Sequence, residues 1–180
     1  MKKLVLVLFA TGFHLAQAQE FFLDKNRKFG LKNQHGRVIF SGKYDNRGWF
    51  ADGLAPVQLN NKWGYIDTRG NVVIPIQYEK TYVFSEGIGV VKMNNECVFI
   101  DKNGKQAFKG RYESFKPFSE GRAAVYAVAD NHATGEKKWG FIDKSGKQVT
   151  PLVYNNVQSF KNGLAMVMIE KHWGGYRHTG

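Results

Sequence analysis

Short apolar runs separated by turn-forming residues recur along most of the 180-residue chain. A first kind of run occurs four times, at residues 54–59, 88–93, 123–128 and 164–169. Second and third kinds follow it, as at residues 63–66 and 72–75. Short runs rich in Val, Ile and aromatic residues are typical of β-strands. Because no stretch keeps the periodicity of an amphipathic helix, the pattern predicts an all-β fold.

The residues between these runs predict tight hairpin turns. Asn60-Asn61 and Asn94-Asn95 separate a first run from a second, and asparagine tolerates the positive φ that such turns need. Second and third runs are separated by Asp-x-x-Gly, at residues 67–70, 101–104 and 143–146. There the carboxylate is expected to accept backbone N–H groups, while glycine takes the left-handed position. Each unit is therefore predicted to be a three-stranded antiparallel meander.

A fixed spacing relates these units to one another. Five positions form what we call the Trp column: Phe29, Trp63, Cys97, Trp139 and Trp173. Successive members are 34, 34, 42 and 34 residues apart. Glycine follows each member after 7 residues, and the first four are also followed by Tyr after 15, Phe after 21 and Gly after 24. The single longer step predicts a loop inserted at about residues 129–137. Such periodicity indicates tandem repeats that bury apolar faces against their neighbours.

About fourteen strands are expected, arranged as an open, curved or solenoid-like array. A propeller-like ring is the alternative, but propeller blades usually have four strands, and these units supply three. The Trp column is expected to fill the core. The glycine after each tryptophan would let an aromatic ring or a neighbouring backbone approach closely.

Two motifs resemble those of the WG-repeat, or KWG-repeat, family. They are K-W-G-Y-I-D-x-x-G-x-V-V-I-P-x-x-Y at residues 62–78, with K-W-G-F-I-D-x-x-G at 138–146, and F-S-E-G at 84–87 and 118–121. The resemblance extends over nearly all of the chain after its first residues. It departs from the family pattern at Phe29, at Cys97-Val98 and at residues 175–177. What it implies is a binding role in a bacterial protein, without catalytic residues.

The first eighteen residues have the features of a secretory signal peptide. Lys2 and Lys3 precede a short apolar stretch, and Ala16-Gln17-Ala18 is a typical cleavage sequence. We therefore expect cleavage after Ala18, one β domain at residues 19–180, and a periplasmic or extracellular location. No stretch reaches the ~20 apolar residues of a transmembrane helix.

The charge of the chain is strongly basic but evenly spread. Its formal net charge of +11 includes Lys2 and Lys3, and no run of like charges occurs. A basic protein favours acidic partners in general. Because the cations are scattered, no nucleic acid partner is expected.

Residues that break the repeat are the candidates for binding. Trp49 is the clearest, because the other units have Val83, Pro117 and Ser159 in its place. With Arg47, Tyr82 and the inserted loop, it would offer a stacking surface for a sugar or a peptide.

Other chemistry has little support in the sequence. Asp52, Glu86 and Glu120 occupy equivalent positions in successive units, so they are not expected to form a catalytic pair. The histidines lack metal-ligand spacing, and neither metal nor cofactor is expected. The leading hypothesis is thus a non-catalytic exported module that binds a protein or an envelope component. Binding of an anionic glycan or cell wall through the basic surface, Trp49, Tyr82 and Tyr126 is the alternative.

Overall fold

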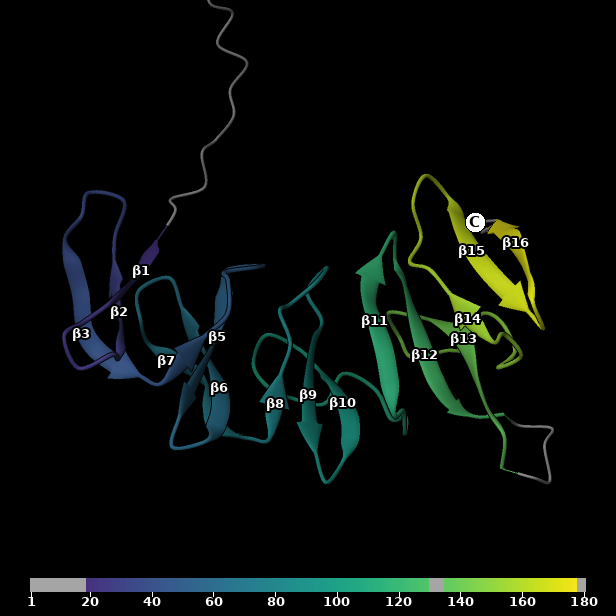
Figure 1. Ribbon diagram of the computed structural model, residues 1–180, viewed down its shortest axis with the longest axis horizontal. Helices are drawn as coiled ribbons and strands as arrows, with labels where there is room; N and C mark the ends of the chain where they lie inside the picture. Colours follow the sequence, from purple (N-terminus) through teal and green to yellow (C-terminus); the bar gives the residue numbers. More distant parts are fainter. Residues whose placement is uncertain (1–18, 130–134, 178–180) are drawn as a thin grey trace, which may run out of the picture.

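The computed structural model describes residues 19–129 and 135–177, and all regular structure in these ranges is β-strand. The strands form five small antiparallel sheets that follow one another in chain order (Figure 1). The all-β prediction is confirmed, and so is the open array, because the first and last sheets lie at opposite ends (Figure 1). The expected signal peptide at residues 1–18 lies outside the described residues.

The first sheet contains β1 (Glu20–Leu23), β2 (Phe29–Lys32) and β3 (Val38–Tyr44). The second contains β4 (Asn46–Arg47), β5 (Leu54–Leu59), β6 (Lys62–Asp67) and β7 (Val72–Tyr78). The third contains β8 (Lys80–Thr81), β9 (Gly89–Met93) and β10 (Glu96–Ile100). The fourth contains β11 (Ser114–Ser119), β12 (Arg122–Val128) and β13 (Lys137–Asp143). The fifth contains β14 (Asn156–Val157), β15 (Leu164–Ile169) and β16 (His172–Arg177).

Two features of these sheets differ from the predicted meander. The third strand forms fully only as β3 and β7; in the next two units it is reduced to isolated bridges, such as Cys97↔Tyr112 and Trp139↔Tyr154. The connections between units also contribute strands, namely β4, β8, β11 and β14, which pair with the first strand of the following unit. Three of these strands have only two residues, too few to leave an apolar pattern in the sequence.

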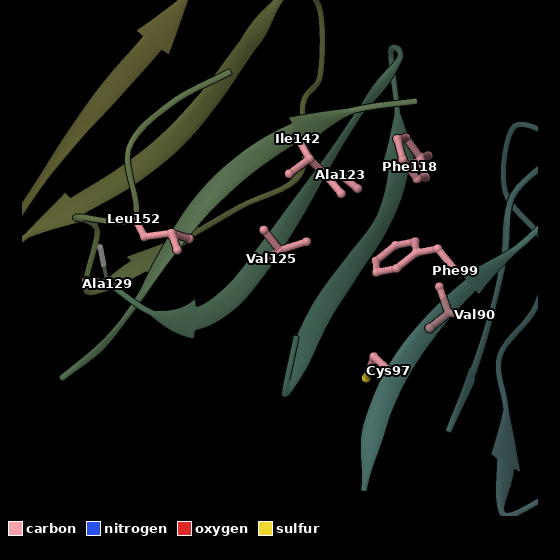
Figure 2. Packing of buried hydrophobic residues seen from close by; sticks show 9 residues of the cluster. All are labelled: Val90, Cys97, Phe99, Phe118, Ala123, Val125, Ala129, Ile142 and Leu152. Carbon is pink, nitrogen blue, oxygen red and sulfur yellow. The ribbon is translucent and has the colours of Figure 1, made fainter. Parts of the chain in front are cut away.

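The core lies between successive sheets rather than within any one of them. We call the side of a sheet that faces the next sheet its leading face, and the opposite side its trailing face. Figure 2 shows one interface, in which Phe99 of the third sheet points toward the fourth. There Phe99 packs against Phe118, with ring centroids 6.2 Å apart, and belongs to a cluster with Val125 and Ile142. Cys97, expected to be a small buried residue, is 2% exposed in the same cluster.

The Trp column fills less of the core than the sequence predicted. Trp63 and Trp139 are only half-buried, and Trp173 is 46% exposed. The deepest side chains stand two residues further along, on the same face of the strand. They are Leu31, Tyr65, Phe99 and Phe141, all at most 2% exposed. The column residue stands beside the hairpin turn, at the rim of the sheet, so the neighbouring sheet covers it incompletely.

The glycine after the tryptophan accommodates the third strand. Trp63 pairs with Tyr78 and Tyr65 with Ile74, so the residues between Ile74 and Tyr78 bulge over Gly64. A Cβ at Gly64 would lie 2.6 Å from the Ile74 carbonyl oxygen and 2.7 Å from that of Pro75. At Gly140 it would lie 2.8 Å from the Pro151 oxygen. The expected close approach of a neighbouring backbone is therefore confirmed.

Replacing Gly64 by alanine should destabilise the protein by about 1–3 kcal/mol, because the backbone of the bulge must move away from the new methyl group. Gly174→Ala is the matched control, since a Cβ there meets no atom within 4 Å. Urea unfolding of both variants measures the difference. Equal midpoints for the two would contradict this role of the glycine.

The F-S-E-G turns link each repeat to the next. Asp52 Oδ2 accepts the N–H of Gly87 at 2.6 Å, and Glu86 Oε2 accepts that of Gly121 at 3.0 Å. Glu120 accepts the N–H groups of Asn162 and Gly163 at 2.6 and 2.7 Å. We call Asp52, Glu86 and Glu120 the turn ladder.

The serine of the same motif makes a parallel link. Ser85 Oγ donates to the Phe118 carbonyl at 2.6 Å, and Ser119 Oγ donates to the Phe160 carbonyl at 2.7 Å. The residue between Ser and Gly has φ near +50°, as in Glu86 and Glu120, which makes a tight two-residue turn. Serine and glutamate therefore serve the neighbouring repeat, and the turn conformation presents both side chains to it.

Glu86 should make stability depend on pH. Burial alone would raise the pKa of Glu86, but the N–H of Gly121 and the nearby Lys144 lower it below its ordinary value. A carboxyl group whose pKa is lower in the folded state stabilises the fold above its unfolded pKa, about 4.3, and this contribution is lost as the pH falls through the folded value.

Glu86→Gln should therefore lower the unfolding free energy at pH 7 by up to about 1 kcal/mol, as expected for an exposed charged contact. The difference from the unmodified protein should vanish below about pH 4, where Glu86 is itself protonated. Glu170→Gln serves as the control, because Glu170 is also a turn residue of positive φ but is not part of the turn ladder. A constant difference between pH 7 and pH 3 would contradict the assignment.

Candidate functional site

A cavity of about 660 Å³ opens beside Trp49, at the junction of the first and second sheets. Trp49 follows β4 and is 72% exposed, more than any other large apolar side chain in the described residues. Arg47 lies in β4 itself. The structure thus places two of the three predicted binding residues in one cavity. The complete lining is Gln19, Glu20, Phe21, Arg47, Trp49, Phe50, Ala51, Asp52, Gly53 and Thr68.

Stacking of aromatic rings on Arg47 organises this cavity. The Arg47 guanidinium carbon lies 4.0 Å from the centroid of the Trp49 ring and 5.3 Å from that of Phe21. Phe21 in turn stacks on Phe50, with centroids 5.5 Å apart. Such cation–π contacts hold an arginine and a tryptophan in a defined orientation even at an exposed site. One broad face for stacking is therefore preorganised before any ligand arrives.

The charges of the cavity are mixed. Glu20 and Asp52 line it together with Arg47, so the carboxylates outnumber the guanidinium. Asp52 is held in place by the Gly87 N–H, as part of the turn ladder. This balance differs from the strongly basic character of the whole chain. The cavity is thus aromatic in its walls and close to neutral in charge.

Tyr82, the third predicted residue, lies at another interface. Its ring is half-buried and makes an edge contact with Phe115, at 4.8 Å between centroids. Its carbonyl accepts the Tyr65 hydroxyl at 2.6 Å. Tyr126, named in the glycan hypothesis, is also half-buried and lies 5.2 Å from Trp139. These two tyrosines belong to the packing of the later sheets and do not extend the surface around Trp49.

The inserted loop joins β12 to β13 in the fourth sheet. Its residues 130–134 lie outside the described residues, and the flanking Ala129 N–H donates to the Glu136 carbonyl. Lys137 forms an ion pair of 2.5 Å with Glu113. The loop therefore belongs to a sheet two places along the array from Trp49.

A scan against protein-family models agrees with the repeat geometry. The model described as WG containing repeat matches residues 29–63, 63–97, 99–126 and 139–173. These matches together cover well over half of the chain and begin or end at members of the Trp column. The chain belongs to the WG containing repeat family. A search of curated proteins finds no match.

The first WG match begins at Phe29, so it leaves out β1, which supplies Phe21 and Glu20 to the cavity. Trp49 lies inside a match but has no counterpart in the other repeats. The cavity therefore combines a strand outside the matched repeats with a residue that departs from their pattern.

The aspartates of the WG repeats serve their own turns. Asp101 Oδ1 accepts the N–H groups of Asn103 and Lys105 at 2.8 and 2.9 Å, as the sequence predicted for these turns. The hydrogen bond from Lys105 holds the pKa of the Asp101 carboxyl below its ordinary value. Asp67 and Asp143 accept backbone N–H groups in the same way.

No metal centre or catalytic pair emerges from the described part of the chain. No three His, Cys, Asp or Glu side chains gather there into a group that would hold a metal ion. The carboxylates of the turn ladder accept backbone N–H groups of successive repeats. The WG containing repeat family identifies no catalytic domain here. Within the described residues, no helix is long and apolar enough to cross a membrane.

Phe21 and Phe50 are the site residues that sequence reasoning missed. Phe50 belongs to the periodic Phe column and was therefore assigned to the core, whereas it is half-buried in the wall of the cavity. Phe21 belongs to the first strand, which has no preceding sheet. A search for aromatic residues in the strand at the end of the array would have identified it.

Proposed function

We propose that this WG-repeat protein is a non-catalytic binding module, and that the cavity beside Trp49 receives an apolar or aromatic side chain of a protein or envelope component. The exposure of Trp49 on its stacked arginine is the observation that carries the proposal. A 72% exposed tryptophan is costly to leave in water unless a partner covers it, and Trp and Arg are the residues most enriched at the centres of interfaces.

The charges of the cavity favour this function over binding of an anionic glycan. Arg47 has its planar face against aromatic rings, and Glu20 and Asp52 oppose an incoming anion. The aromatic surface of Trp49, Tyr82 and Tyr126 that the glycan hypothesis required is not assembled. A peptide segment with an apolar side chain and a neighbouring cation matches the cavity best.

Trp49→Ala should abolish this binding. Residues 19–180 with a fluorescent label would be applied to peptide and glycan arrays, followed by titration of the strongest ligand. Affinity should fall at least tenfold in Trp49→Ala, which corresponds to about 1.4 kcal/mol. Val83→Ala, at the equivalent position of the next repeat, should leave it unchanged. Binding confined to anionic glycans and lost at high salt would refute the proposed ligand class.

We further propose that the protein acts outside the cytosol, on the basis of the signal-like residues 1–18. Expression of the full chain in a Gram-negative bacterium, followed by fractionation and mass spectrometry, tests this. The exported form should begin at Gln19. A cytosolic protein that retains Lys2 and Lys3 would count against export.

A further inference from the structure

The outer edge of β16 lacks a strand that the earlier sheets have. In the first two sheets, β3 and β7 pair with the second strand. In the third and fourth, bridges from Cys97 to Tyr112 and from Trp139 to Tyr154 take their place. Among the described residues, β16 pairs only with β15. Its other edge therefore presents unpaired backbone donors and acceptors, which can template an added strand.

The glycine that receives this strand is present and its notch is empty. At Gly30, Gly64 and Gly140, a Cβ would lie within 2.8 Å of a carbonyl oxygen of the third segment. At Gly174, the equivalent residue of β16, a Cβ would meet no atom within 4 Å. The last sheet therefore keeps the shape that admits a bulged strand, and no described residue occupies it.

The surface around this edge is apolar. Trp173 is 46% exposed, and Met166 and Leu164 on the adjoining β15 are 43% and 41% exposed. Met166 lies opposite Gly175, at the place where Tyr65, Phe99 and Phe141 pack into a following sheet. The opposite end of the array is different, because its outermost strands pair Glu20 with Lys32, and the Lys32 ammonium lies over the Phe22 ring at 4.7 Å. Charged residues thus cover one end, as in repeat arrays that face water, and the other end remains apolar.

We propose that β16 is the docking edge for an extended segment of a partner protein, which adds the strand that the fifth sheet lacks. This mode of recognition is β-augmentation, in which the backbone supplies affinity and pockets for side chains supply specificity. The established third strands define the chemistry of the segment. Trp63 pairs with Tyr78 and Trp139 with Tyr154, so the docked segment should place a tyrosine beside Trp173. Four residues before it, at the position of Ile74, it should carry a β-branched apolar residue.

A second copy of this chain does not supply such a segment from its described residues. Its fully formed third strands are already paired within their own sheets, and Tyr44 and Tyr78 at their ends are at most 5% exposed. Release of either strand would expose the core of the donor molecule. The occupant is therefore a different chain that has an extended segment free.

A synthetic peptide that copies residues 71–80 is the direct probe, because it contains the third strand of the second sheet with Tyr78. Isothermal titration of residues 19–180 with this peptide should show saturable binding with one site. A peptide in which alanine replaces that tyrosine should bind at least tenfold more weakly. These two measurements use the unaltered protein.

Two protein variants test the notch itself. Gly174→Val should weaken binding at least tenfold without lowering the melting temperature, since the new side chain meets nothing in the free protein. Gly175→Val is the matched control: its side chain points to the other face of the same strand and also meets nothing within 4 Å, so binding should persist. Trp49→Ala should bind the peptide normally, because the cavity beside Trp49 lies in another sheet.

Three results would overturn the proposal. The first is no saturable binding of the peptide by the unaltered protein at millimolar concentration. The second is an equal loss of binding in Gly174→Val and Gly175→Val, which would show that the notch plays no part. The third is a dimer in the absence of peptide that Gly174→Val dissociates, because a second copy would then occupy the edge.

Discussion

Each sheet of this array is too small to bury either of its faces alone, and the whole structure depends on the insertion of one large side chain per repeat into the following sheet. Phe99 exemplifies this packing, with Phe118 and Phe115 of the fourth sheet around it. Tyr65 and Phe141 make the same insertion elsewhere. Because burial of an aromatic side chain is the largest favourable contribution that one residue makes, the repeats are stable only as a stack.

The conspicuous motif of the sequence has a different purpose from this insertion. Trp-Gly lies at the edge where the second strand meets the third, and its glycine admits the carbonyl groups of Ile74 and Pro75. The F-S-E-G turn acts at the far end of the hairpin, where Ser85 and Glu86 contact the next repeat. One motif therefore completes a sheet and the other joins two sheets, while the residue that fills the core stands between them and varies among Leu, Tyr and Phe.

The period of the sequence was sufficient to predict strands, turns and the open array, because a position that recurs every 34 residues must have the same environment in each unit. It was less informative about depth. Trp63 and Tyr65 share one face, and alternation alone cannot tell which of them a neighbouring sheet covers. The two-residue strands β4, β8 and β14 also escaped prediction, since a pair of residues carries no periodicity and pairing depends on where the chain enters the next sheet.

The candidate site shows the same division between periodic and individual residues. Trp49 was found because Val83, Pro117 and Ser159 replace it, and Arg47 because it is near in sequence. Phe21 was missed because its contact with Phe50 joins two sheets. Tyr82 lies instead against Phe115, since a side chain two positions before a core phenylalanine faces the following repeat.

The two ends of the array have different chemistry, and this difference bears on how a repeat protein acquires function. Interior sheets spend both faces on each other, so their surfaces are limited to edges and turns. Only a terminal sheet has a face and an edge that the stack does not use. At the first sheet the chain places charges outward and builds an aromatic cavity from Phe21 and Trp49; at the last it leaves Trp173 exposed beside the empty notch of Gly174. A site that arises at a terminus can change without disturbing the stack, because no other repeat must match it.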